Sequence, residues 1–157
     1  MRDDRNQYIH DVRVRLGIPD SRRRAVARAA MAWAQTEGGA TYGSPWHGAE
    51  TDYNLWNTTR VYNGSTQQPG NSVPVQVFKS RSDGVTASVL TLKQSNMAGI
   101  LKAMKNPKAS AHDICKAIYN SPWGTGHLIF NVLHDIVASG MYEDYNKLIY
   151  PQTNLGG

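Results

Sequence analysis

Among its 157 residues the sequence has one cysteine, three glutamates and no long apolar run. The single cysteine, Cys115, excludes an internal disulfide framework and a multi-cysteine zinc site. No stretch approaches the roughly 18 apolar residues that a membrane-spanning helix needs. The first residues also lack the apolar segment of a signal peptide. We therefore expect a chain that folds in a reducing compartment and does not insert into a membrane.

Carboxylates are scarce in the middle of the chain. Between residues 38 and 110 they are limited to Glu50, Asp52 and Asp83. A catalytic hypothesis that requires two carboxylates therefore has few candidates.

Positive charge is in excess, with a formal net charge of +5 at pH 7. Such a balance favours an anionic partner, either nucleic acid or an acidic polymer surface. Arginines are concentrated in the first 30 residues, a pattern typical of the solvated faces of helices. The sequence contains no zinc finger, ribonucleoprotein signature or basic region with heptads, so we expect no nucleic-acid partner.

Apolar residues recur with helical spacing over most of the chain. One alanine-rich segment, residues 21–37, has small residues on several faces, which predicts a helix packed closely by others. Its basic first turn opposes the helix dipole, so we expect those arginines to have partners. Further helices are expected over residues 3–16, from Ser80 or Ser82 to Leu92, near 96–105, over 110–119 and 127–139, and within 141–150.

Residues 38–79 differ in kind, being rich in Gly, Ser, Thr, Asn, Pro and aromatic side chains. The runs Arg60–Tyr62 and Val75–Phe78 resemble short strands separated by turn-forming residues. We therefore predict an α+β, mostly α-helical fold with a small β-element after the second helix. Residues 1–150 are expected to form a single domain, and residues 151–157 a loose tail.

Glu37 is the leading candidate for chemistry. It lies four residues after Trp33, on the same face of the predicted helix, and Gly38 and Gly39 follow it. A carboxyl group beside an indole can act as a general acid, because desolvation favours its protonated form. The simpler interpretation is an exposed glutamate in the last turn of an amphipathic helix, ended by glycine.

The segment 52–59 combines aromatic rings, which stack on sugar faces, with Asn and Thr side chains that bind hydroxyl and acetamido groups. Glycoside cleavage usually employs two carboxyl groups, about 5 Å apart for retention or about 6.5–9.5 Å for inversion. Asp52 or Glu50 could assist Glu37, and Asp83 is a third option, although Asp83 is more simply a helix-start residue. A substrate acetamido group could also replace the second carboxylate. The alternative is a loop held together by its own aromatic residues.

Two other kinds of site are weaker candidates. Cys115 could be a nucleophile with His112 as its base, but it lies among Ile114 and Ile118, where an inert buried thiol is typical. His127 and His134 are seven residues apart without a surrounding metal motif. We therefore expect no metal and no cofactor.

Taken in order, these segments resemble the lysozyme-like superfamily, in particular goose-type lysozymes, soluble lytic transglycosylases, and related domains of lysins and tail-associated proteins from phages of actinobacteria. The family's Gly-Leu-Met-Gln segment is absent, and Asn54-Leu55-Trp56-Asn57 occupies that region. The motifs that carry the resemblance are Trp33…Glu37-Gly38-Gly39, Asn54…Asn57-Thr58-Thr59, Ser82-Asp83-Gly84-Val85…Thr91-Leu92, Ala117-Ile118-Tyr119-Asn120-Ser121 and Ser121-Pro122-Trp123-Gly124-Thr125-Gly126.

The resemblance implies a peptidoglycan-degrading glycosidase, a muramidase or lytic transglycosylase, that cleaves the β-1,4 bond between N-acetylmuramic acid and N-acetylglucosamine. Its expected partner is the bacterial cell wall, together with other virion proteins if it is carried on a phage particle. Before lysis it would lie in the host cytoplasm or in the virion. The rival hypothesis is a non-catalytic virion or wall-binding protein of the same fold. The expected catalytic residues are Glu37 and Asp52, and the expected substrate-binding residues are Tyr53, Trp56, Asn57, Thr58, Tyr119 and Trp123.

Overall fold

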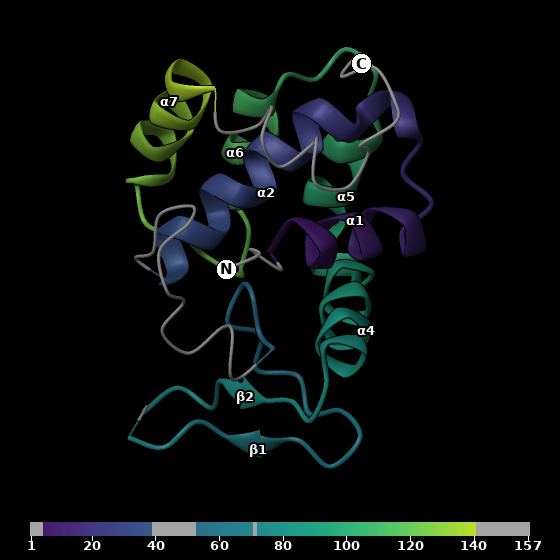
Figure 1. The fold of residues 1–157 in the computed structure, drawn as a ribbon, viewed down its shortest axis with the longest axis vertical. Helices are drawn as coiled ribbons and strands as arrows, with labels where there is room; N and C mark the ends of the chain where they lie inside the picture. Colours follow the sequence, from purple (N-terminus) through teal and green to yellow (C-terminus); the bar gives the residue numbers. More distant parts are fainter. Residues whose placement is uncertain (1–4, 39–52, 71, 141–157) are drawn as a thin grey trace.

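The computed structural model describes residues 5–38, 53–70 and 72–140 (Figure 1). This part of the chain contains six α-helices, two 3-10 turns and one two-stranded sheet, which confirms the predicted mostly helical α+β class. The final helix and the tail predicted after residue 140 lie outside the described residues. The elements are α1 (Arg5–Arg15), η1 (Asp20–Arg22), α2 (Arg23–Gly38), β1 (Thr66–Gln67), β2 (Gln76–Val77), α4 (Arg81–Leu92), η2 (Ser95–Met97), α5 (Ala98–Lys105), α6 (Ala111–Tyr119) and α7 (Ile129–Ser139).

Helix α2 runs through the middle of the helical body and contacts α1, α6 and α7 (Figure 1). Alanine at several buried positions allows these neighbours to approach its backbone closely, as the sequence predicted. Met31 and Trp33, both completely buried, add the large side chains that fill the remaining space. Its four buried alanines are Ala29, Ala30, Ala32 and Ala34.

The basic residues before α2 have partners, as expected from their position at a helix N-terminus. The guanidinium group of Arg22 is buried and donates to the carbonyl oxygens of Met104 at 2.9 Å and Ala109 at 2.7 Å. These carbonyls lie at and just after the C-terminal turn of α5, where backbone acceptors have no partner within the helix. Arg23 pairs with Asp20 at 3.0 Å. Arg22 therefore joins the start of α2 to the end of α5.

Helix α4 begins at the residue that its sequence predicted. The hydroxyl of Ser80 accepts a hydrogen bond from the amide of Asp83 at 3.1 Å. The carboxylate of Asp83 accepts from the side chain of Asn63 at 3.2 and 3.3 Å. Asp83 is therefore a helix-start residue that also holds a turn of the β-region. Helix α7 ends at Gly140, which adopts the left-handed conformation with φ 74°.

The β-element is present, but one predicted strand is wrong. Strand β1 lies at Thr66–Gln67 rather than Arg60–Tyr62, and it pairs antiparallel with β2 in the register Thr66↔Val77. Asn63 and Gly64, with φ of 46° and 72°, turn the chain after Tyr62, so that pairing starts later. Val61 is 69% exposed, since it lies outside the sheet. Figure 1 shows this hairpin at one end of the molecule, beyond α4.

Candidate functional site

Glu37 lies in the last turn of α2, where the helix leaves the core. Residues up to Ala34 are buried, whereas the side chains of Thr36 and Glu37 are partly exposed. The hydroxyl of Thr36 donates to the carbonyl of Ala32 at 2.8 Å, so it is engaged by its own helix. Glu37 therefore stands at the boundary between the packed interior and solvent, on the element that the fold holds most firmly.

A compact turn over residues 53–58 faces this helix end. Its organising side chain is Asn54, which is 2% exposed. The Asn54 amide donates to the carbonyls of Thr58 at 2.9 Å and Gln76 at 2.8 Å, and its side-chain oxygen accepts from the amide of Thr58 at 2.8 Å. The Thr58 hydroxyl is 2.8 Å from that of Thr91 in α4. This buried network fixes the turn to both the hairpin and α4.

Asn57, within this turn, contacts Glu37 directly. Its side-chain nitrogen Nδ2 donates to Glu37 Oε2 at 3.1 Å, across 20 residues of sequence. The backbone of Asn57 is left-handed, with φ 57°, a conformation that few residues other than glycine adopt readily. Backbone conformations of this kind concentrate at sites where the surrounding structure enforces a particular geometry. Here that geometry aims the Asn57 amide at the carboxylate.

Three tryptophans form the floor beneath this contact. The rings of Trp33 and Trp56 stack with centroids 4.8 Å apart, and Trp123 meets Trp33 edge-on at 4.6 Å. The indole nitrogen of Trp56 donates to the carbonyl of Ala30 at 3.1 Å, and that of Trp123 donates to the carbonyl of Trp56 at 2.7 Å. These bonds connect α2, the turn over residues 53–58 and the loop after α6.

The structure corrects the role expected of two residues. Trp56 and Thr58 were predicted to line a substrate cleft, but they are 1% and 2% exposed. Both are used internally, Trp56 by its stack on Trp33 and Thr58 by its bond to Thr91. Inward-facing and outward-facing side chains could not be separated from the sequence pattern, because the turn has no regular period.

The other predicted site residues have different positions. Tyr53 and Trp123 are partly buried. Tyr119 is 41% exposed at the end of α6, where its ring contacts those of His127 and Phe130. No contact in the described residues joins Tyr119 to Glu37. The position of Asp52 lies outside the described residues, as does that of Glu50.

The loop after α6 also reaches the end of α2. A Cβ on Gly126 would lie 3.9 Å from the methyl group of Thr36, next to Glu37. Thr125, the preceding residue, is 9% exposed, and its hydroxyl has no hydrogen-bond partner among the described residues. The same holds for the indole nitrogen of Trp33 and the side-chain nitrogen of Gln35. Buried polar groups without partners are uncommon, and three of them occur around this helix end.

The alternative chemistries receive no support from the described residues. Burial raises the pKa of the Cys115 thiol from 9.0 to about 12, which disfavours the reactive thiolate. His134 lies beside Asp135 at 3.6 Å on the exposed side of α7, while His127 packs against Tyr119. Within the described ranges, no three His, Cys, Asp or Glu side chains are grouped so that they could hold a metal ion.

No family model, curated protein or solved structure matches this chain. Among the helices of the described residues, none has both the length and the apolarity needed to cross a bilayer. The case for a function therefore depends on the site itself.

Proposed function

We propose that this chain is a peptidoglycan-degrading glycosidase with a lysozyme-like fold, and that Glu37 is its general acid. The observation that carries the proposal is the 3.1 Å hydrogen bond from Asn57 Nδ2 to Glu37 Oε2. An exposed glutamate that only ends a helix does not require an amide donor on a left-handed residue of a buried turn. A carboxyl group that must act on a substrate in one orientation does.

The hydrogen bond distinguishes the two carboxyl oxygens of Glu37. The Asn57 amide nitrogen can only donate, so its N–H favours an unprotonated Oε2 and leaves the acidic proton on Oε1. Glu37 would pass this proton to the glycosidic oxygen while the bond between that oxygen and the sugar C1 breaks. The carboxylate that remains keeps the N–H of Asn57, which stabilises its new charge.

The same carboxylate would then act as the base. It would accept a proton from the hydroxyl that attacks C1, which is water in a muramidase or a hydroxyl of the muramic acid itself in a lytic transglycosylase. Asp52 remains our candidate for a second carboxylate, because it directly precedes Tyr53 and the turn that carries Asn57. If Asp52 does not reach the substrate, the acetamido group of the sugar would take its place.

The arrangement of the elements supports a lysozyme-like fold. A long helix packed by α1, α6 and α7 ends at the candidate acid, and a small antiparallel hairpin follows it. Tyr119 and Trp123 come from a loop that also approaches the end of α2, consistent with one wall of a saccharide site. The net charge of +5 suits an anionic cell wall. We propose a phage lysin or a virion-associated enzyme as its biological setting.

The test compares wild-type protein with Glu37→Gln on purified bacterial peptidoglycan. We expect the rate at which reducing ends or anhydro-muropeptides are released to fall at least about 100-fold, because general acid catalysis contributes about 10²- to 10⁴-fold. Asp135→Asn, which makes a similar change at an exposed position of α7, is the matched control and should keep the wild-type rate. Equal rates for wild type and Glu37→Gln would refute the assignment. Wall binding without any product from the wild type would favour a non-catalytic wall-binding protein.

A further inference from the structure

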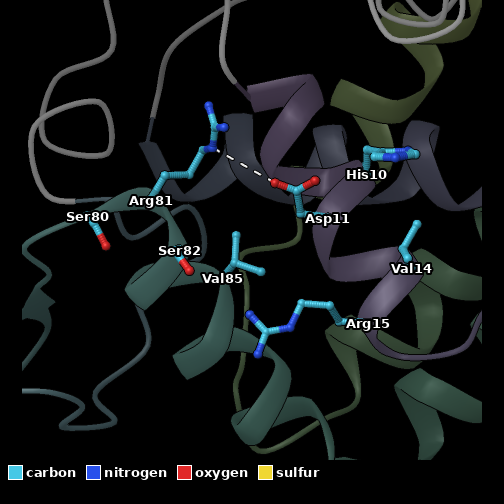
Figure 2. Close-up of a pocket in the computed structure, with 8 residues that line it drawn as sticks. All are labelled: His10, Asp11, Val14, Arg15, Ser80, Arg81, Ser82 and Val85. Atoms are coloured by element: carbon cyan, nitrogen blue, oxygen red, sulfur yellow. Dashed lines mark ion pairs between the residues drawn. The ribbon is translucent and has the colours of Figure 1, made fainter.

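A second cavity, which shares no lining residue with the Glu37 site, opens between α1 and α4. Its volume is about 450 Å³, within the range of about 300–1,000 Å³ that is typical of small-molecule sites. Figure 2 shows its lining side chains, which come from α1, α4 and the residue before α4. They are His10, Asp11, Val14, Arg15, Ser80, Arg81, Ser82 and Val85.

Arg15 supplies a positive charge whose position is fixed by a neutral group. Its Nη1 donates to the hydroxyl of Thr86 at 2.7 Å, and that hydroxyl in turn donates to the carbonyl of Ser82 at 2.9 Å. Within the described part of the chain, Arg15 forms no ion pair. A guanidinium group held in this way keeps its charge and several donors for an external anion.

Arg81 lies on the other side of Val85, with its guanidinium group near Asp11 (Figure 2). The distance from Arg81 Nε to Asp11 Oδ2 is 3.9 Å, longer than a hydrogen bond. Asp11 Oδ1 accepts from the side chain of Gln7 at 2.9 Å. The carboxylate therefore neutralises Arg81 only loosely, and Oδ2 remains available to accept from the hydroxyl of a ligand.

The remaining lining residues add hydroxyl groups and apolar surface. Ser80 and Ser82 contribute hydroxyls beside Arg81, and Val14 and Val85 contribute apolar surface. Burial, followed by the nearby positive charge of Arg13, lowers the pKa of His10. The His10 imidazole is therefore neutral at pH 7, and two guanidinium groups outweigh one carboxylate.

We propose that this cavity binds a phosphorylated polyol or sugar. The phosphate would contact Arg15 and Arg81, since planar guanidinium groups bind phosphate oxygens with two parallel hydrogen bonds. Asp11 and the two serines would bind the hydroxyls, and Val85 would pack against the carbon chain. A purely inorganic anion would gain nothing from Asp11, whose negative charge would repel it, so the ligand needs both the phosphate and the hydroxyl groups.

Isothermal titration of the whole protein tests this assignment with four probes. Glycerol 3-phosphate presents a phosphate monoester with hydroxyls, and glycerophosphoglycerol presents the phosphodiester of a polyol polymer. Inorganic phosphate and glycerol present each half alone. We expect at least one of the two esters to bind more tightly than both halves. The preferred ester distinguishes a free metabolite from a segment of a wall polymer.

The variants separate this cavity from general charge. Arg15→Gln should weaken binding of the preferred ester at least about tenfold, because a charge-assisted contact is lost. Lys105→Gln removes one positive charge from the exposed end of α5, outside the cavity, and should leave binding unchanged. Glu37→Gln should also bind normally, which keeps this result independent of the proposed glycosidase activity. No binding of either ester, equal binding of inorganic phosphate, or equal losses in Arg15→Gln and Lys105→Gln would overturn the proposal.

Discussion

Gly84, in the first turn of α4, lies directly against the backbone of Tyr53. A Cβ at position 84 would overlap the carbonyl oxygen of Tyr53, and no flexible side-chain end is involved that could move away. The turn that presents Asn57 to Glu37 therefore starts at a point where only glycine allows α4 to approach. Residue 84 thus affects the Glu37 site through backbone packing, although it does not contact that site.

Gly84→Ala should destabilise the protein, because either α4 or the Tyr53 backbone must move. We expect the free energy of unfolding to fall by about 1–3 kcal/mol, the usual cost of overpacking. Gly99→Ala is the matched control, since a Cβ at this position of α5 would meet no neighbouring atom within 4 Å. It should gain about 0.5–1 kcal/mol from the better helix propensity of alanine. Urea unfolding followed by circular dichroism measures both, and equal stabilisation by the two alanines would contradict the close contact.

Asn57→Gly separates the positioning of Glu37 from the backbone conformation of the turn. Glycine accepts φ 57° without strain but has no amide to donate to Glu37. We expect stability to stay within about 1 kcal/mol of wild type. Peptidoglycan cleavage should fall about tenfold, as expected for the loss of one hydrogen bond to a charged group.

Initial rates and thermal melts of Asn57→Gly and Asn57→Ala test this account. The alanine variant also lacks the amide but must adopt a left-handed backbone, so it should lose both activity and stability. If the glycine variant kept the wild-type rate, Asn57 would have no positioning role.

The helices of this chain could be predicted because each carries its own signals. Ser110 and Asp113 form the capping box at the start of α6, and Gly140 ends α7 in the left-handed conformation. These signals lie within a few residues of one another, so local sequence is sufficient to place them. The alanine-rich pattern of α2 likewise indicated its central position.

The region between α2 and α4 was less predictable because its structure depends on long-range contacts. Strand β1 was misplaced, since the Asn63–Gly64 turn sets the start of pairing. Trp56 was expected at a cleft, but its place is set by Trp33, 23 positions away, and by the Ala30 carbonyl. The partnership of Asn57 with Glu37 is also long-range. Asn and Trp were recognised as functional residue types, while their orientations required the fold.

Trp123→Phe tests whether Trp123 is a structural residue as well as a candidate saccharide contact. Phenylalanine keeps an aromatic ring against Trp33 but removes the donor that lies 2.7 Å from the carbonyl of Trp56. We expect a loss of about 1–3 kcal/mol in the free energy of unfolding, because a buried carbonyl loses its partner. Tyr119→Phe, at an exposed aromatic residue, should change stability by less than about 0.5 kcal/mol. Equal unfolding midpoints for both variants in urea would argue against the structural role of the indole.

Cys115 predicts how the protein responds to alkaline pH. Burial raises the pKa of its thiol from 9.0 to about 12, so the folded state keeps its proton over a pH range in which the unfolded state loses it. This contribution to stability is fully present below pH 9 and should decrease as pH rises from about 9 to 12. Burial also raises the pKa of the Tyr8 hydroxyl, which adds a loss in the same direction at higher pH.

Two measurements on Cys115 test this account. A thiol-specific disulfide reagent at pH 8 should react with Cys115 far more slowly in the native protein than in urea, because the folded thiol is both buried and protonated. Cys115→Ala should reduce the loss of unfolding free energy between pH 8.5 and 10.5, a window that lies below the titration of folded Tyr8. The alanine variant will be less stable at neutral pH, so the slope against pH is the quantity to compare with wild type. Identical slopes, or rapid native labelling at pH 8, would show that the thiol is not shielded in solution.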